Sequence, residues 1–137
     1  MQQGHVKSMD QAFKRYLGAG KPGDVKQHWP ALATALQWIK ASGGVAVLAH
    51  PLHYKMTATK LRALLSDFSD LGGDAIEVIN GRQTKDRTRY LAQLAERYAL
   101  KASVGSDFHR PGTHFCELGQ VADLPPECTP VWTAFNA

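Results

Sequence analysis

Apolar residues return every three or four positions in several stretches of the chain, which is the spacing of one face of a helix. This pattern predicts helices over residues 8–17, 31–41, 57–71 and 84–98. The first and third begin with a serine or threonine that can cap a helix, and glycines follow the first three. The helix over residues 8–17 is expected to be an appendage to the rest of the fold.

Short runs rich in β-branched residues alternate with the later helices and predict strands. They cover residues 45–49, residues 75–80 and the segment that leads into Asp107. Parallel strands joined by helical crossovers form a sheet that is covered on both faces, so the predicted fold class is α/β. A last strand is predicted over residues 118–122.

Composition limits the class of protein further. The chain has 137 residues, of which 44% are hydrophobic and 20% charged, so it can bury a core and is not a disordered chain. Its longest apolar run, residues 45–49, is too short for a membrane span, so no membrane partner is expected. Two cysteines and a polar first ten residues favour a cytoplasmic location. A net charge of +4 is compatible with an anionic substrate.

Histidines and carboxylates stand where the predicted strands end. His50 follows the first strand, and Asp107 and His109 follow the third. The carboxyl ends of parallel strands meet at one edge of a sheet, where functional sites form. Asp107 and His109 would point to the same side of an extended segment, and His50 could join them from the neighbouring strand. Such a set suits Mn²⁺, Zn²⁺ or Fe²⁺, although one histidine alone at a strand end is more often structural.

Other polar residues near these strand ends each leave two interpretations open. His53 could contact a phosphate or act as an acid, or it could be an exposed loop residue. Glu77, inside the second strand, could orient a ligating histidine or face solvent. A basic cluster near the start of the following helix could attract phosphate or form a solvated face. Its members are Arg82, Lys85, Arg87 and Arg89.

Three segments carry a more specific pattern: GGVAVLAHP at 43–51, DAIEVIN at 74–80 and GSDFH at 105–109. In this order, with helices between them, they resemble the carboxyl-terminal half of the PHP (polymerase and histidinol phosphatase) phosphoesterases, closest to the bacterial TrpH/YciV type. KRYLGAGKPGDV at 14–25 resembles the segment by which that type re-enters its barrel from a helical insertion. The resemblance therefore implies the end of that insertion and the re-entry segment over residues 1–30, and the carboxyl-terminal part of the barrel over 31–137.

The resemblance also implies an activity. Members of the family form a distorted (β/α)₇ barrel whose strand ends hold up to three divalent metal ions, which activate water for attack on phosphorus. By motif match, His50, Asp107 and His109 would be metal ligands, and Asp107 and His109 would be the catalytic pair. His53 stays a candidate for binding the substrate. The implied substrates are nucleotides, either nucleoside 3′,5′-bisphosphates or the 5′ end of short RNA.

Some residues of the family pattern are absent from this sequence. The family's amino-terminal half supplies an H-x-H pair, further ligands and a substrate-gripping arginine, and no H-x-H occurs in the 137 residues. We therefore expect the missing amino-terminal half of the same protein to be a partner, and the chain alone to bind metal weakly and hydrolyse poorly. The open sheet edge of half a barrel favours self-association.

Two other functions compete with this interpretation. The chain could be a stable, non-catalytic α/β module that binds a nucleotide or a partner, with the strand-end residues as relics. A general RNA-binding domain is a weaker alternative, motivated by the basic composition. An RNA affinity that is absent or independent of salt would exclude it.

Overall fold

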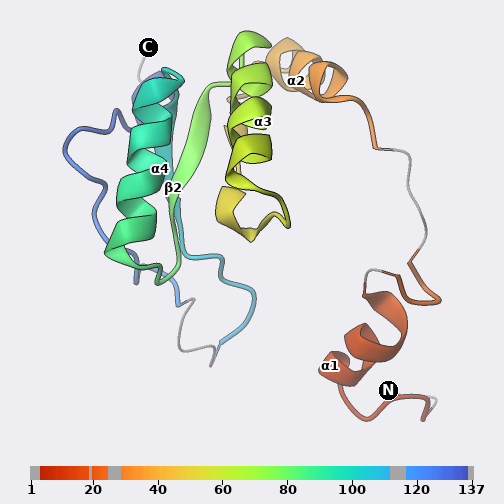
Figure 1. Cartoon of the computed structure of the whole chain (residues 1–137). Coiled ribbons are helices and arrows are strands. Elements are labelled where there is room, and N and C mark those ends of the chain that lie inside the picture. The colour runs from red at the N-terminus through yellow and green to blue at the C-terminus, as the bar shows by residue number, and fades with distance from the viewer. Residues whose placement is uncertain (1–3, 19, 25–28, 112–116, 136–137) are drawn as a thin grey trace. The chain divides into compact units, whose positions relative to one another are not determined.

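The computed structural model describes residues 4–18, 20–24, 29–111 and 117–135 (Figure 1). The chain forms two compact units, Met1–Pro30 and Ala31–Ala137. Across the described ranges, no helix combines the length and the hydropathy that a membrane crossing requires.

Among its described residues, the first unit contains one short helical segment. The α-helix α1, Met9–Ala12, continues as a π-helical turn, η1, Phe13–Leu17. The Ser8 hydroxyl caps it by accepting a hydrogen bond from the Gln11 N–H, as the sequence predicts. The N–H of Gly18 donates to the carbonyl of Phe13, five residues back, which gives the second half its π geometry. None of the residues of this segment is buried within the unit.

The second unit alternates strands and helices. It begins with α2, Leu32–Ala41, and continues with β1, Val47–Leu48, and the 3₁₀ turn η2, Pro51–His53. It then runs through α3, Ala58–Asp70, β2, Ala75–Asn80, α4, Lys85–Arg97, β3, Lys101–Gly105, and the 3₁₀ helix η3, Val131–Phe135 (Figure 1). The hydroxyls of Thr57 and Thr84 cap α3 and α4 by accepting hydrogen bonds from backbone N–H groups three residues on.

The three strands form a parallel sheet in the order β1-β2-β3, which confirms the α/β class. Val47 pairs with Ala75, and Asn80 pairs with Gly105. Along β2, Ala75, Ile76, Val78 and Ile79 are each at most 1% exposed, so both faces of this strand are covered. β1 is shorter than the predicted run over residues 45–49.

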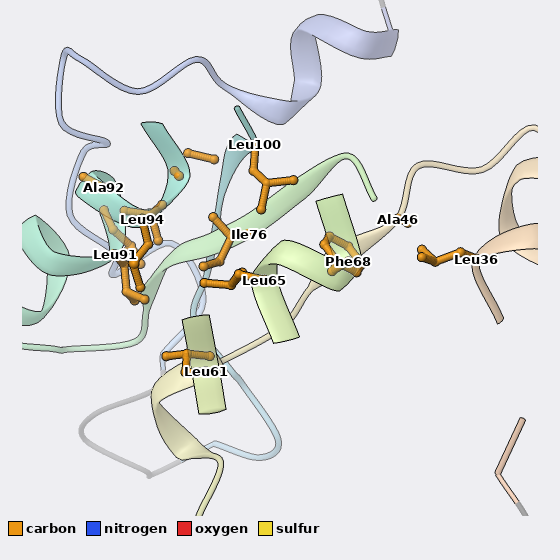
Figure 2. Packing of buried hydrophobic residues seen from close by; sticks show 14 residues of the cluster. Leu36, Ala46, Leu61, Leu65, Phe68, Ile76, Leu91, Ala92, Leu94 and Leu100 are labelled. Atoms are coloured by element: carbon orange, nitrogen blue, oxygen red, sulfur yellow. The ribbon is translucent and has the colours of Figure 1, made fainter. Parts of the chain in front are cut away.

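The buried core lies where the helices meet this sheet (Figure 2). One face of α3 contributes Leu61, Leu65 and Phe68. The spacing of three and four residues between them places them on one side of the helix. α4 likewise buries residues from one of its faces, namely Leu91, Ala92, Leu94 and Ala95. Two of the helices predicted from apolar periodicity, α3 and α4, therefore supply one buried face each to the core around β2.

The predicted strand over residues 118–122 is wrong, because within 117–135 the structure has no strand there. The segment begins with a turn, in which the Gln120 N–H donates to the Glu117 carbonyl. A later segment meets the outer edge of β3. The Ala102 N–H donates to the Thr129 carbonyl at 2.8 Å, and Pro130 forms a single parallel bridge with Ala102. Proline has no N–H to donate, so it is confined to the edge of a sheet.

Asp74 connects α2, the segment before β1 and the start of β2. Its carboxylate accepts hydrogen bonds from the Lys40 ammonium and, at 2.7 Å, from the Ala46 N–H. Burial acts to raise the pKa of Asp74, but these two hydrogen bonds and the charges of Lys40 and Lys101 lower it below its ordinary value overall. A carboxylate with a lowered pKa stabilises the fold above its unfolded pKa, and that contribution is lost as the pH falls through the folded pKa.

We therefore expect Asp74→Asn to lower the free energy of unfolding by about 1 kcal/mol at pH 7, because the Ala46 N–H and Lys40 lose a charged acceptor. The difference should shrink as the pH falls below about 4 and through the lowered pKa of Asp74, because the wild-type carboxyl is itself protonated below that pKa. Urea unfolding of both proteins at neutral and acidic pH measures it. Asp123→Asn is the control, because Asp123 is exposed and lies outside the helices and strands. The same loss at both pH values would contradict this account of Asp74.

Candidate functional site

The carboxyl ends of the three strands carry the residues that the sequence singles out. His50 follows β1, Glu77 lies in β2, and Asp107 follows β3. Because β2 lies between β1 and β3, His50 and Asp107 are not on neighbouring strands, and the prediction that they are is wrong. Each βα unit adds its strand beside the previous one, so the first and third strands end up on opposite sides of the second.

His50 has an unusual backbone conformation. Its φ of 33° and ψ of 55° place it in the left-handed region, which costs a residue other than glycine about 1 kcal/mol or more. The following Pro51 begins η2, and the His50 N–H donates a 2.6 Å hydrogen bond to Oε2 of Glu77. The Glu77 carboxylate is thus the direct partner of the strained residue.

Two aromatic side chains enclose the His50 ring. The His53 ring stacks on it with centroids 5.5 Å apart, and the Tyr54 ring meets it edge-on at 6.0 Å. The Tyr54 hydroxyl donates to the Ala49 carbonyl at 2.7 Å. Burial, and next the nearby charge of Glu77, raise the pKa of Tyr54, so this hydroxyl stays protonated and remains a donor at neutral pH.

Asp107 and His109 lie together, but not for the reason that the sequence suggests. The φ of Asp107 is 55°, so the segment is not extended and the two-residue alternation of a strand does not apply. Nδ1 of His109 nevertheless lies 3.8 Å from Oδ1 of Asp107 and 2.7 Å from its carbonyl oxygen. The His109 side chain is 78% exposed and that of Asp107 is 33% exposed, so both can be reached from solvent.

The donor chemistry of these residues fits a divalent metal ion in part. Nδ1 of His50 is buried and has no hydrogen-bond partner in the described part of the chain. Such an unsatisfied buried nitrogen calls for a further partner, and an ion is one of the partners that can supply it. Asp107 and His109 add a carboxylate and an imidazole. Within the described ranges, however, no three His, Cys, Asp or Glu side chains come together closely enough to hold a metal.

A small hollow adjoins His50. Its lining includes His50, His53, Asn80 and Arg87, and its volume of about 20 Å³ is enough for one water molecule. Two other arginines of the basic cluster have partners away from His50. Arg82 donates a hydrogen bond to Gln120 at 2.8 Å, and Arg89 forms an ion pair with Asp86 at 3.3 Å. His53 and Arg87 are therefore the basic side chains that the structure brings next to His50.

Sequence reasoning overlooks two residues of this site, Tyr54 and Gly105. A Cβ atom at Gly105 would lie 2.3 Å from Oε1 of Glu77, so a side chain there would collide with the carboxylate. The signal available in the sequence is a glycine at the end of one strand and a glutamate inside the mostly apolar run of the strand before it. No local pattern marks Tyr54, because its contacts to His50 and Ala49 depend on the turn at Pro51.

Comparison with known proteins finds close similarity to two curated enzymes. The chain is 47% identical over 135 residues to a 5′-3′ exoribonuclease from Haemophilus influenzae, a match that covers 98% of this chain and 49% of the relative. It is 44% identical over 134 residues to a 3′,5′-nucleoside bisphosphate phosphatase from Chromobacterium violaceum, covering 98% of this chain and 47% of the relative. The chain spans about half the length of these relatives. No family model matches it.

Solved structures share the fold. An amidohydrolase from Chromobacterium violaceum, with bound sulfate and no metal, superposes with a TM-score of 0.78 at 42% identity, covering 98% of this chain and 46% of that one. A structure from Bifidobacterium adolescentis described as a metal-dependent phosphoesterase has a TM-score of 0.59 at 23% identity, covering 93% and 42%. The second likeness concerns the fold alone.

Proposed function

We propose that this chain is the carboxyl-terminal portion of a PHP-family, metal-dependent phosphoesterase that hydrolyses phosphate esters of nucleotides. The observation that carries the proposal is identity of 44–47%, over nearly the whole chain, to relatives named as a nucleoside bisphosphate phosphatase and an exoribonuclease. The substrates proposed for the whole protein are a nucleoside 3′,5′-bisphosphate or the 5′ end of a short RNA. The parallel sheet would be part of the (β/α)₇ barrel.

In this proposal His50, Asp107 and His109 are the metal ligands that this chain supplies. Bound divalent ions, Mn²⁺, Zn²⁺ or Fe²⁺, would lower the pKa of water and neutralise charge on the phosphoryl group. The buried Nδ1 of His50 and the pair formed by Asp107 and His109 support this assignment.

His53 and Arg87 are proposed to bind the phosphate of the substrate. Both line the hollow beside His50, and both are exposed enough to meet a ligand from solvent. An arginine offers several N–H donors to phosphate oxygens, and a histidine adds one more. Arg87 also lies in the first turn of α4, where the helix dipole favours an anion.

The chain alone is proposed to be inactive. No three ligand side chains converge in the described residues, so other parts of the protein would have to complete the site. Its proposed partner is the amino-terminal half of the same protein, in keeping with a match to about half of each relative. In the described residues β1 pairs with a strand on one side only, and this open edge favours either that partner or self-association.

A chimera tests the proposal. This chain replaces the matched part of the Chromobacterium violaceum phosphatase, so that the relative supplies the rest of the site. With Mn²⁺ present, the chimera should release phosphate from a nucleoside 3′,5′-bisphosphate, whereas the 137-residue chain should not exceed the buffer rate. A chimera that unfolds cooperatively and binds the nucleotide without turnover would contradict the proposal and favour a non-catalytic binding module.

A further inference from the structure

Glu77 occupies the centre of the three strand ends. It lies in β2, between β1 and β3, and is half-buried. The register of β2 against β3 shifts between Glu77 and Ile79, so the strand is irregular at this point. Its Oε2 accepts a 2.6 Å hydrogen bond from the His50 N–H and a 3.2 Å hydrogen bond from the Asn80 side-chain amide.

The contact with His50 fixes a conformation that the residue would otherwise avoid. A histidine in the left-handed region needs surroundings that hold it there. A hydrogen bond from a backbone N–H to a carboxylate is among the stronger ones in proteins, and 2.6 Å is short for its kind. Because φ and ψ of His50 set the direction of its Cα–Cβ bond, this hydrogen bond also sets where the imidazole points.

The other carboxylate oxygen of Glu77 faces the end of β3. Oε1 would lie 2.3 Å from a Cβ atom built on Gly105, and the backbone of Gly105 is not in the left-handed region. A side chain at Gly105 would therefore have to push the Glu77 carboxylate aside and disturb its hydrogen bonds to His50 and Asn80. Asp107 follows Gly105 by two residues. The Glu77 carboxylate therefore contacts both the backbone of His50 and the strand end that precedes Asp107.

We infer that Glu77 is a positioning residue, which fixes the His50 backbone on one side and the Gly105 strand end on the other. This inference deepens the proposed function. It rests on that function, because positioning His50 and Asp107 matters for hydrolysis only if they are the metal ligands. The geometric part of the inference stands on the His50, Asn80 and Gly105 contacts alone. Glu77 would act through these residues and not by touching the substrate.

Nuclear magnetic resonance of the metal-free 137-residue chain tests the His50 contact. In the wild type, the His50 amide proton should resonate far downfield and exchange slowly with solvent, as expected for a short hydrogen bond to a charged acceptor. Glu77→Ala should move this signal upfield and speed its exchange about tenfold or more, while Glu77→Gln, which keeps an acceptor oxygen, should largely restore both. Glu96→Ala, at an exposed position, is the matched control.

A double-mutant cycle tests the Gly105 contact. Gly105→Ala should destabilise the wild-type chain, because the new Cβ meets the carboxylate, and should cost much less when Glu77 is already alanine. An equal cost in both backgrounds would overturn the inference, as would an unchanged His50 signal in Glu77→Ala. Neither measurement uses metal. A chain that passes both tests, yet shows no effect of Mn²⁺ at His50, would instead contradict the proposed function.

Discussion

Replacing Asp107 with asparagine is expected to lower bisphosphate hydrolysis by the chimera about a hundredfold or more, since losing even the groups that support a metal ligand costs roughly 10- to 100-fold. Asparagine has nearly the same shape as aspartate but lacks the charge that attracts a divalent cation. It also tolerates the left-handed conformation seen at Asp107, where φ is 55°. The substitution therefore tests the carboxylate without disturbing the backbone. Initial rates of phosphate release across a range of Mn²⁺ concentrations measure the effect.

Asp123→Asn provides the control for this experiment, because Asp123 is exposed and lies outside the strand ends. It should leave the rate unchanged, and both variants should unfold at the wild-type temperature. His50→Asn should show a loss similar to that of Asp107→Asn, since asparagine also accepts the left-handed backbone of His50 while removing the imidazole. A folded Asp107→Asn chimera with the wild-type rate would exclude Asp107 from the metal site.

Leu65→Ala is expected to cause the largest loss of stability, about 3 kcal/mol. Leu65 is fully buried in the cluster that α3, β2 and α4 form (Figure 2). Removing its side-chain methyl groups loses their burial and leaves a cavity, and such changes cost roughly 2–5 kcal/mol. Urea unfolding followed by circular dichroism gives the free energy of unfolding of each variant.

Leu71→Ala is the matched control, because Leu71 directly follows α3 and is 45% exposed. It makes the same chemical change outside the core and should cost less than about 1 kcal/mol. Equal losses for the two variants would show that α3 does not pack on the sheet through Leu65.

The helices and the central strand could be predicted because their signals are local. Thr57 stands at the start of an apolar periodicity, and its hydroxyl caps α3. Residues 75–80 form a continuous run around one glutamate, and they become β2 with both faces covered. The predicted strand over residues 118–122 is wrong, and the edge of β3 is instead met by Thr129 and Pro130, which no strand-like pattern in the sequence marks.

The residues of the candidate site could be predicted, but not their geometry. His50, Asp107 and His109 stand out as polar residues after strands, whereas no local pattern marks the left-handed backbones of His50 and Asp107. Glu77 illustrates the difference. Its sequence context leaves open whether the side chain faces solvent or orients a ligating histidine. The 2.6 Å hydrogen bond that it accepts from the His50 N–H is visible only in the structure.

The central claim is that the strand ends carrying His50, Asp107 and His109 bind a divalent metal ion. Mn²⁺ added to the ¹⁵N-labelled chain tests it most directly, because a paramagnetic ion broadens nearby signals even when it binds weakly. The amide signals of these three residues should broaden before those of the exposed Asp86 and Asp123, and Asp107→Asn should remove the preference. Broadening that begins at the exposed carboxylates, or that Asp107→Asn leaves unchanged, would contradict the claim.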